Sequence, residues 1–257
     1  MRFASLGSGS AGNALVVEAG RGASVTRVLL DCGFSAREIE RRLARLGLDF
    51  DALDAILITH EHSDHVGSAL TLARRWSLPL YASWGTARAV SADEEALDLR
   101  VLSSDAAVMI GELAVRPYTV PHDAREPLQF VLSDGASRLG VLTDAGEATA
   151  HIGAALAGCD ALVLECNHDR RMLAQGRYPA ALKARIGGSL GHLNNDAAAG
   201  LLASLDYSRL RYLIAAHLSQ HNNTPELARA ALANVLGNAP VEIEVASQDE
   251  GFGWIWL

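Results

Sequence analysis

Hydrophobic and polar residues alternate along this chain with two different periods. Short apolar runs bounded by turn-forming residues predict β-strands, and the first three are FASL, ALVVEA and SVTRVLLD, which lie between residues 3 and 31. The stretch SAREIERRLARLG instead places Ile39, Leu43 and Leu46 at i, i+4 and i+7, the spacing of one face of an amphipathic helix. We expect the several arginines of this helix to form its solvated face.

The same mixture continues to the end of the chain. AILIT, a helix ending near Trp76, the strand PLYAS and a long β region from about Val108 to Thr143 come next. The last part alternates again, with strands predicted at ALVLE, YLIAAHL and VEIEV, helices at NNDAAAGLLASL and TPELARAALANVL, and an apolar tail FGWIWL. Because no low-complexity linker or convincing repeat interrupts the pattern, we expect one α/β domain over residues 1–257.

Charged and imidazole side chains stand where successive apolar runs end. The runs are LLD, ILITH, YTVPH, VLTD, LVLE and LIAAH, and their last residues are Asp31, His60, His122, Asp144, Glu165 and His217. Loops at strand ends converge at one rim of a sheet. These residues are therefore candidates for a shared site.

One turn concentrates such groups. The stretch LITHEHSDHVGS, between an apolar strand and a helix, holds His60, His62, Asp64 and His65 within six positions. Imidazole with carboxylate suits zinc and similar divalent metals, and the lack of cysteine here points away from a closed structural zinc site. His60 and His62 can grasp one ion, while Asp64 and His65 can point at a second. The spacing suggests a two-metal site, and isolated surface histidines are the alternative.

The string THEHSDH resembles the signature of the metallo-β-lactamase-fold hydrolases. Further motifs of that family follow in order as LLDCG, PHD, LTDAG and AHLS, and GSGSAGNA, LECNHD, GHLNNDAA and AHLSQHNNTPELA resemble its YycJ (WalJ) branch over nearly the entire chain. This resemblance implies a four-layer αβ/βα sandwich. It also implies a nuclease-like protein with exonuclease activity on DNA.

Carried over by motif, the resemblance implies ligands for two divalent ions, zinc or manganese. The first ion would be held by His60, His62 and His122, the second by Asp64, His65 and His217, and Asp144 would bridge them. Asp31 would support the ligand loop, since a metal-bound imidazole needs an acceptor that fixes its ring, although a plain turn carboxylate is the alternative. Two adjacent ions generate a hydroxide from a bridging water at neutral pH, so hydrolysis is the expected reaction.

His192 is the first candidate for a donor or acid beside a scissile phosphate. Its motif GHLNNDAA resembles the histidine loop of tRNA 3′-end processing ribonucleases, in which the histidine contacts that phosphate, and Asn194 or Asn195 could cap the following helix. Glu165 and His168 of LECNHD would orient His192 or a leaving group. The alternative for His192 is a helix-entry residue without chemistry.

Substrate contacts are expected from two further segments. Five cations could guide a nucleic-acid backbone or form an ordinary solvated face, and they are Arg170, Arg171, Arg177, Lys183 and Arg185. Tyr178 could stack on a base or simply pack. In the glycine-rich turn GSGSAGN, which we expect near the active-site rim, Ser8, Ser10 or Asn13 could add a supporting contact.

Composition adds four constraints. The net charge of −8 repels polyanions at long range, so any nucleic-acid role must rest on local patches. Three cysteines argue against a disulfide framework, and each is expected to be buried. Without a signal-peptide core or an apolar stretch of about 20 residues, we expect a soluble cytoplasmic protein with no membrane partner. His151, away from the polar turns, is expected to be a solvated helix residue.

The predicted function is a dinuclear metal-dependent phosphodiester hydrolase that acts on nucleic acid, as an exonuclease on DNA in preference to RNA, with a metal-bridging hydroxide as the nucleophile. One alternative is a hydrolase of a small ester, such as a glyoxalase-type thioester or a lactone. It would use the same metal ligands but gives no reason for His168, His192 and the cations. The other alternative is a regulatory protein that binds metal without catalysis.

Overall fold

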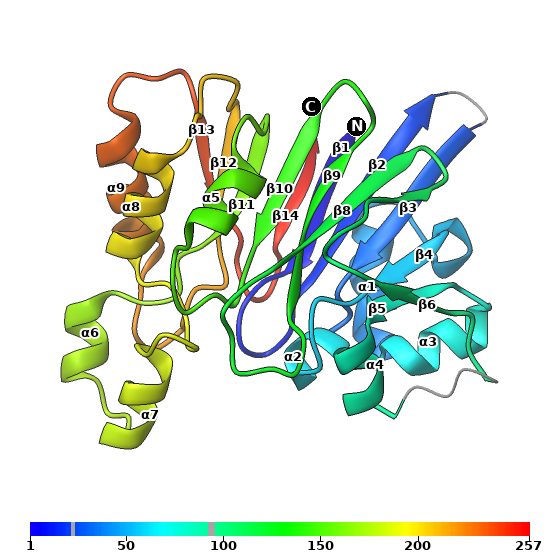
Figure 1. The fold of residues 1–257 in the computed structure, drawn as a ribbon, viewed down its shortest axis with the longest axis horizontal. Helices are drawn as coiled ribbons and strands as arrows, with labels where there is room; N and C mark the ends of the chain where they lie inside the picture. Colours follow the sequence, from blue (N-terminus) through cyan, green and yellow to red (C-terminus); the bar gives the residue numbers. More distant parts are fainter. Residues whose placement is uncertain (22–23, 92–95) are drawn as a thin grey trace.

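Two seven-stranded sheets face each other, and helices cover their outer surfaces (Figure 1). This computed structural model describes residues 1–21, 24–91 and 96–257. The first and last strands pair antiparallel, with Arg2 opposite Trp256, so the two ends of the chain lie side by side (Figure 1).

The first sheet is built from the N-terminal part of the chain and the last strand. Its strand order is β14 (Phe252–Trp256), β1 (Arg2–Gly7), β2 (Ala14–Arg21), β3 (Ser24–Leu30), β4 (Ala55–Leu57), β5 (Leu80–Ser83) and β6 (Leu99–Leu102). The associated helices are α1 (Ala36–Arg45), the 3-10 turn η1 (Phe50–Ala52), α2 (Ser63–Val66), α3 (Ala69–Trp76) and α4 (Trp84–Ala89). Strands β3 to β6 run parallel, while β14, β1, β2 and β3 pair antiparallel.

The second sheet follows in sequence. Its order is β13 (Glu242–Val245), β12 (Tyr212–Ala216), β11 (Ala161–Glu165), β10 (Arg138–Leu142), β9 (Leu128–Ser133), β8 (Leu113–Thr119) and β7 (Val108–Ile110). The helices of this half are α5 (Ala150–Leu156), α6 (Arg170–Gln175), α7 (Ala180–Ile186), α8 (Asn195–Ser204) and α9 (Pro225–Leu236). Helices α5, α8 and α9 cover the sheet, and α6 and α7 lie beyond its edge (Figure 1).

Alternation along the strands explains the layers. Val28 and Val163 point into a core between the sheets, whereas Leu29 packs under the helices of the first half and Leu164 under those of the second. Strands buried on both faces read as continuous apolar runs, which is why LLD and LVLE lack a polar face. The result is helix, sheet, sheet and helix, which confirms the predicted α/β sandwich.

The expected solvated face of α1 is wrong at one position. The Arg42 side chain is only 7 % exposed, and its guanidinium donates to the carbonyls of Leu6 and Gln248 and lies 3.9 Å from the ring centroid of Phe34. A cation can be buried here because backbone oxygens that end two strands or turns need donors. Sequence periodicity does not show such needs.

The expectations for the cysteines and for His151 are confirmed. The three cysteines are free and buried, and His151 is an exposed residue of α5. No helix in the described part of the chain is long and apolar enough to span a membrane. The short helices α4, α6 and α7 were not predicted, because six or seven residues are too few for a clear apolar period.

Candidate metal centre

The candidate residues gather where strands of both sheets end, at the edge near α2 (Figure 1). Three of them have left-handed backbones, with φ of 59° at Asp31, 55° at Asp144 and 55° at His217. Each follows a strand directly or after one residue. Non-glycine residues adopt this conformation rarely and at a cost, and they concentrate at functional sites. The sharp turns thus bring side chains of separate strands to one point.

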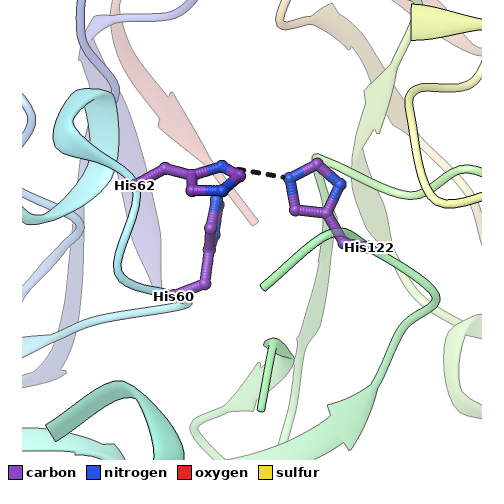
Figure 2. Close-up of side chains that lie close together, drawn as sticks. All are labelled: His60, His62 and His122. Atoms are coloured by element: carbon purple, nitrogen blue, oxygen red, sulfur yellow. Dashed lines mark hydrogen bonds between the residues drawn. The ribbon is translucent and has the colours of Figure 1, made fainter. Parts of the chain in front are cut away.

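His60, His62 and His122 form the first cluster (Figure 2). Their ring centroids are 4.6 to 5.0 Å apart. The Nε2 of His122 lies 3.3 Å from the Nδ1 of His62 (Figure 2). Ligand atoms of all three lie within 4.8 Å of one another, which a single ion can span.

Asp64, His65 and His217 form a second cluster beside the first. The Oδ2 of Asp64 lies 3.5 Å from the Nε2 of His217 and 3.6 Å from the Nε2 of His65. Asp144 stands between the clusters, with Oδ2 at 2.9 Å from the Nε2 of His65 and Oδ1 at 4.0 Å from the Nε2 of His122. This is the position that a bridging carboxylate would need.

Unpartnered atoms test whether the clusters fit a metal. Among the described residues, the buried side-chain atoms that lack a hydrogen bond include the Nε2 of His60, the Nε2 of His217 and the Oδ2 of Asp144. The short approach of Asp144 to His65 is therefore a charge contact without hydrogen-bond geometry. Buried polar atoms are seldom left unpaired, since each costs roughly 1–3 kcal/mol. Nitrogen and oxygen donors without thiolate suit zinc-like or manganese-like ions.

Protonation in the metal-free protein follows from burial and neighbours. Burial lowers the pKa of His60 well below its usual value, and the adjacent His65 lowers it further. Burial opposes the charge on His217 as well, but Asp144, Asp64 and Glu165 together outweigh burial and raise the pKa of His217 to about 10. Burial would raise the pKa of Asp144, yet His217 and His65 hold it well below its usual range. A bound cation would replace these protons.

Asp31 lies behind two of the candidate ligands. It is buried, and its Oδ2 accepts a hydrogen bond from the Nδ1 of His65 at 2.7 Å. The Thr59 hydroxyl donates to the same oxygen at 2.9 Å and lies 3.0 Å from the Nδ1 of His60. One carboxylate thus fixes two rings through their Nδ1 atoms. Sequence reasoning missed Thr59, although it opens the THEHSDH string.

Glu165 and His192 form a pair at the edge of the clusters. Glu165 is fully buried, its Oε1 lies 2.8 Å from the Nδ1 of His192, and its Oε2 accepts the backbone N–H groups of Ala145 and Leu193. Burial disfavours a charged His192, but Glu165 and Asp144 together outweigh burial and raise the pKa of the imidazole. The expectation that Glu165 orients His192 therefore has a direct contact behind it.

His168 contacts Asn167 and Asn195 instead of His192. Its Nδ1 is 3.3 Å from the Oδ1 of Asn167, its backbone oxygen accepts the N–H of Asn195, and burial lowers its pKa to about 4. The described residues show no hydrogen bond between His168 and His192. Asn194 caps α8 by accepting the N–H of Ala197 at 3.0 Å.

Two residues of the glycine-rich turn form hydrogen bonds to the backbone of candidate ligands. The buried Ser8 accepts the N–H of His217 at 2.9 Å, and Asn13 donates to the backbone oxygen of Asp64 at 3.2 Å. Only Ser10 of the three expected residues lines the cavity described next.

A cavity of about 220 Å³ opens at the two clusters. The candidate site residues that line it are His62, Asp64, Asp144, His192 and His217. The segment of α7 and the residues before it adds Tyr178, Leu182, Arg185 and Ile186 to the lining. The arrangement brings metal-ligating groups, an oriented imidazole and space for a substrate to one place.

Comparison with known proteins agrees with this geometry. Residues 26–217 match the family model described as "Beta-lactamase superfamily domain". This chain belongs to the beta-lactamase superfamily. The predicted resemblance is confirmed.

Two relatives match this chain over nearly its whole length. The exodeoxyribonuclease YycJ of Bacillus anthracis is 32% identical over 256 residues, which are 98% of this chain and 91% of the relative. The exodeoxyribonuclease WalJ of Streptococcus pneumoniae is 31% identical over 249 residues, 95% of this chain and 91% of the relative. Two ribonucleases match over shorter stretches of 104 and 107 residues.

Solved structures of the superfamily share the fold. The metallo-beta-lactamase fold protein YhfI from Bacillus subtilis superposes with a TM-score of 0.74 at 17% identity, covering 99% of each chain. At that identity the likeness concerns the fold alone.

Of the five predicted cations, Arg185 and Lys183 form polar contacts within the described part of the chain. Arg185 lines the cavity and its Nε lies 2.7 Å from the Oδ2 of Asp123, next to His122. The Nζ of Lys183 donates to the backbone oxygen of Ala174. The three remaining cations are exposed and form no ion pair within the described ranges, and they are Arg170, Arg171 and Arg177.

Proposed function

We propose that this beta-lactamase superfamily member is a dinuclear metal-dependent phosphodiester hydrolase that acts on nucleic acid, as an exonuclease on DNA. The observation that carries the proposal is the pair of donor clusters on either side of Asp144, beside the Glu165-bound His192. Hydrolysis of a small ester would use the same candidate ligands, but it gives no reason for the exposed cations Arg170, Arg171 and Arg177.

The metal ligands follow from the two clusters. His60, His62 and His122 would hold one ion, Asp64, His65 and His217 the other, and Asp144 would serve both. When bound, such ions supply a water-derived nucleophile at neutral pH and neutralise charge on the attacked group. The unpartnered nitrogens of His60 and His217 are the atoms free for this purpose.

His192 would act on the phosphate through its second ring nitrogen. Its Nδ1–H donates to Glu165, so the imidazole is held in one orientation and carries a proton on Nε2 when charged. A charged donor at the cavity wall would stabilise a non-bridging phosphate oxygen or protonate the leaving oxygen. Glu165 would act by positioning, since its two oxygens are occupied by His192 and backbone N–H groups.

DNA rather than RNA is supported by the two long matches to exodeoxyribonucleases. The net charge of −8 means that attraction for a polyanion must be local, and the exposed cations before and within α6 and α7 supply it.

The test is degradation of end-labelled single- and double-stranded DNA and RNA with manganese or zinc. We expect metal-dependent loss of end label from DNA, abolished in His60→Ala and retained in His151→Ala, which removes an exposed histidine of α5. Protein that carries two ions but cleaves none of these polymers would contradict the proposal.

A further inference from the structure

The segment that holds α6 and α7 contributes to none of the three hydrophobic cores. No residue between Asn167 and His192 belongs to a core, and α7 buries no side chain completely. In Figure 1 both helices extend away from the sheets below α8 and α9. Since the segment does not stabilise the sandwich by core packing, its apolar residues need another explanation.

Those apolar residues face the cavity. Tyr178, Leu182 and Ile186 are spaced four apart, which places them on one side of α7 and its approach, and all three line the cavity and are half-buried. The same cavity is lined by His62, Asp64, Asp144, His192 and His217, which come from the segments after strands and from the loop before α8. The cavity lining therefore combines polar, metal-ligating residues with apolar residues.

Specific contacts hold the apolar wall over the clusters. The ion pair of Arg185 with Asp123 ties α7 to the residue after His122. The backbone oxygen of Ile186 accepts the N–H of His192 at 2.9 Å. Tyr178 meets the ring of His221 edge to face, with centroids 6.0 Å apart. Two of these contacts join the wall to residues of the candidate site or next to them, and the third joins it to the loop that follows β12.

We propose that Tyr178, Leu182 and Ile186 form a subsite for the base and sugar of the one nucleotide whose phosphate lies at the metal clusters. The proposal rests on the proposed function and adds which unit of the polymer the cavity takes. A nucleotide matches this mixed lining, because its phosphate is anionic and its base presents an apolar face.

Size limits the occupant to one nucleotide. A volume of about 220 Å³ is below the roughly 300–1,000 Å³ of sites for drug-sized ligands, and it cannot enclose a duplex or several bases. A site that encloses one nucleotide takes a chain end. Stacking against this wall is tolerant of base identity, because every base presents a π-face.

The experiment compares binding of nucleotides with binding of their sugar phosphates. Isothermal titration with zinc-loaded protein would use deoxyadenosine 3′- and 5′-monophosphate and the matching abasic deoxyribose phosphates. We expect the base to tighten binding by about fivefold or more, the range of a stacked base. Leu182→Ala and Tyr178→Ala should lose that difference, and Tyr178→Phe should keep it.

Leu190→Ala is the matched control, since Leu190 is an exposed leucine of the same segment that does not line the cavity. Equal affinity for nucleotide and sugar phosphate in the native protein, no binding of either nucleotide, or an equal loss in Leu190→Ala would overturn the subsite. Failure of the proposed function looks different: the nucleotide would bind with the base effect while no polymer is degraded.

Discussion

Asp31, Asp144 and His217 show at the scale of single residues how the site is made. All three have positive φ, although none is glycine, and all three side chains contact the histidine clusters. Aspartate tolerates this conformation better than most residues, because its short side chain hydrogen-bonds locally. The strain is maintained by the strands that precede each residue.

Asp31→Asn tests support of the ligands. Asparagine keeps the size and tolerates the left-handed backbone, but its uncharged side chain is a weaker acceptor for His65. We expect metal affinity to fall by about 10- to 100-fold, measured by competition with a chromophoric chelator. Asp51→Asn, at an exposed position in η1, should leave affinity unchanged. An unchanged metal affinity in Asp31→Asn would show that Asp31 only forms the turn and does not support the ligands.

His192→Asn tests the proposed donor. The amide can still pair with Glu165 but cannot carry a transferable proton, so kcat on DNA should fall by about 10²- to 10⁴-fold. Metal content should stay at the native value, because His192 belongs to neither proposed ligand set. The control is His151→Asn. A kcat within about threefold of the native value would remove His192 from the chemistry.

Metal loading should release protons at neutral pH. The pKa of His217 is raised to about 10 and that of His65 also lies well above its usual value, so both are charged at pH 7 without metal. A nitrogen must lose its proton to bind an ion. Titration in buffers of different ionisation enthalpy should therefore show proton release, with affinity rising as pH rises. Proton-neutral binding would show that these imidazoles are not ligands.

At the scale of elements, α1 contacts N-terminal and C-terminal segments that lie side by side at one edge of the first sheet. Its apolar side places Ile39 and Leu43 under the strands, while Arg42 reaches past them to Leu6 at the end of β1 and to Gln248 before β14. Glu38 binds both Arg41 and Arg42, at 2.6 Å in each pair. The helix thus contributes both packing and two buried hydrogen bonds.

Arg42→Ala should lower the free energy of unfolding by about 2–4 kcal/mol, because it removes two buried hydrogen bonds to carbonyl oxygens and the contact with Phe34. Arg41→Ala removes a pair with the same Glu38, but Arg41 is exposed and solvent screens the pair, so the expected loss is much smaller than in Arg42→Ala. Urea denaturation measures both. Equal losses would show that the buried hydrogen bonds add nothing.

At the scale of the whole molecule, the clusters sit on the seam between the sheets. His60, His62, Asp64 and His65 follow the first sheet's β4, while His122, Asp144 and His217 follow strands of the second. A bound ion would therefore crosslink the two halves. We propose that residues 1–257 form a single domain, because the sheets also share the central core.

Removal of metal should lower Tm. At a free metal concentration about 100-fold above Kd, binding stabilises the folded state by about 2.7 kcal/mol, which corresponds to roughly 5–10 °C in a protein of this size. Calorimetry before and after chelation measures the shift. His60→Ala should show a smaller change in Tm on chelation. A chelation-insensitive Tm in metal-replete protein would contradict ions at the seam.

The sequence by itself determined most elements and the candidate ligands. Apolar periods located the longer strands and helices, and the THEHSDH turn with the polar ends of later strands named the residues that the structure brings together. Local order is enough for this, since strand alternation and loop position are properties of neighbouring residues. The short helices and the burial of Arg42 could not be predicted from such patterns. Packing determines the short helices, and carbonyl oxygens far away in the sequence determine the position of the Arg42 side chain.

Only the tertiary structure decided which groups meet. The fold places Thr59 between Asp31 and His60. It pairs His192 with Glu165 and not with His168, and it brings residues of α7 to the cavity at the clusters. These contacts join positions that lie far apart along the chain or depend on the path of a turn. Their distances follow from sheet order and strained strand ends, which no local pattern of residues records.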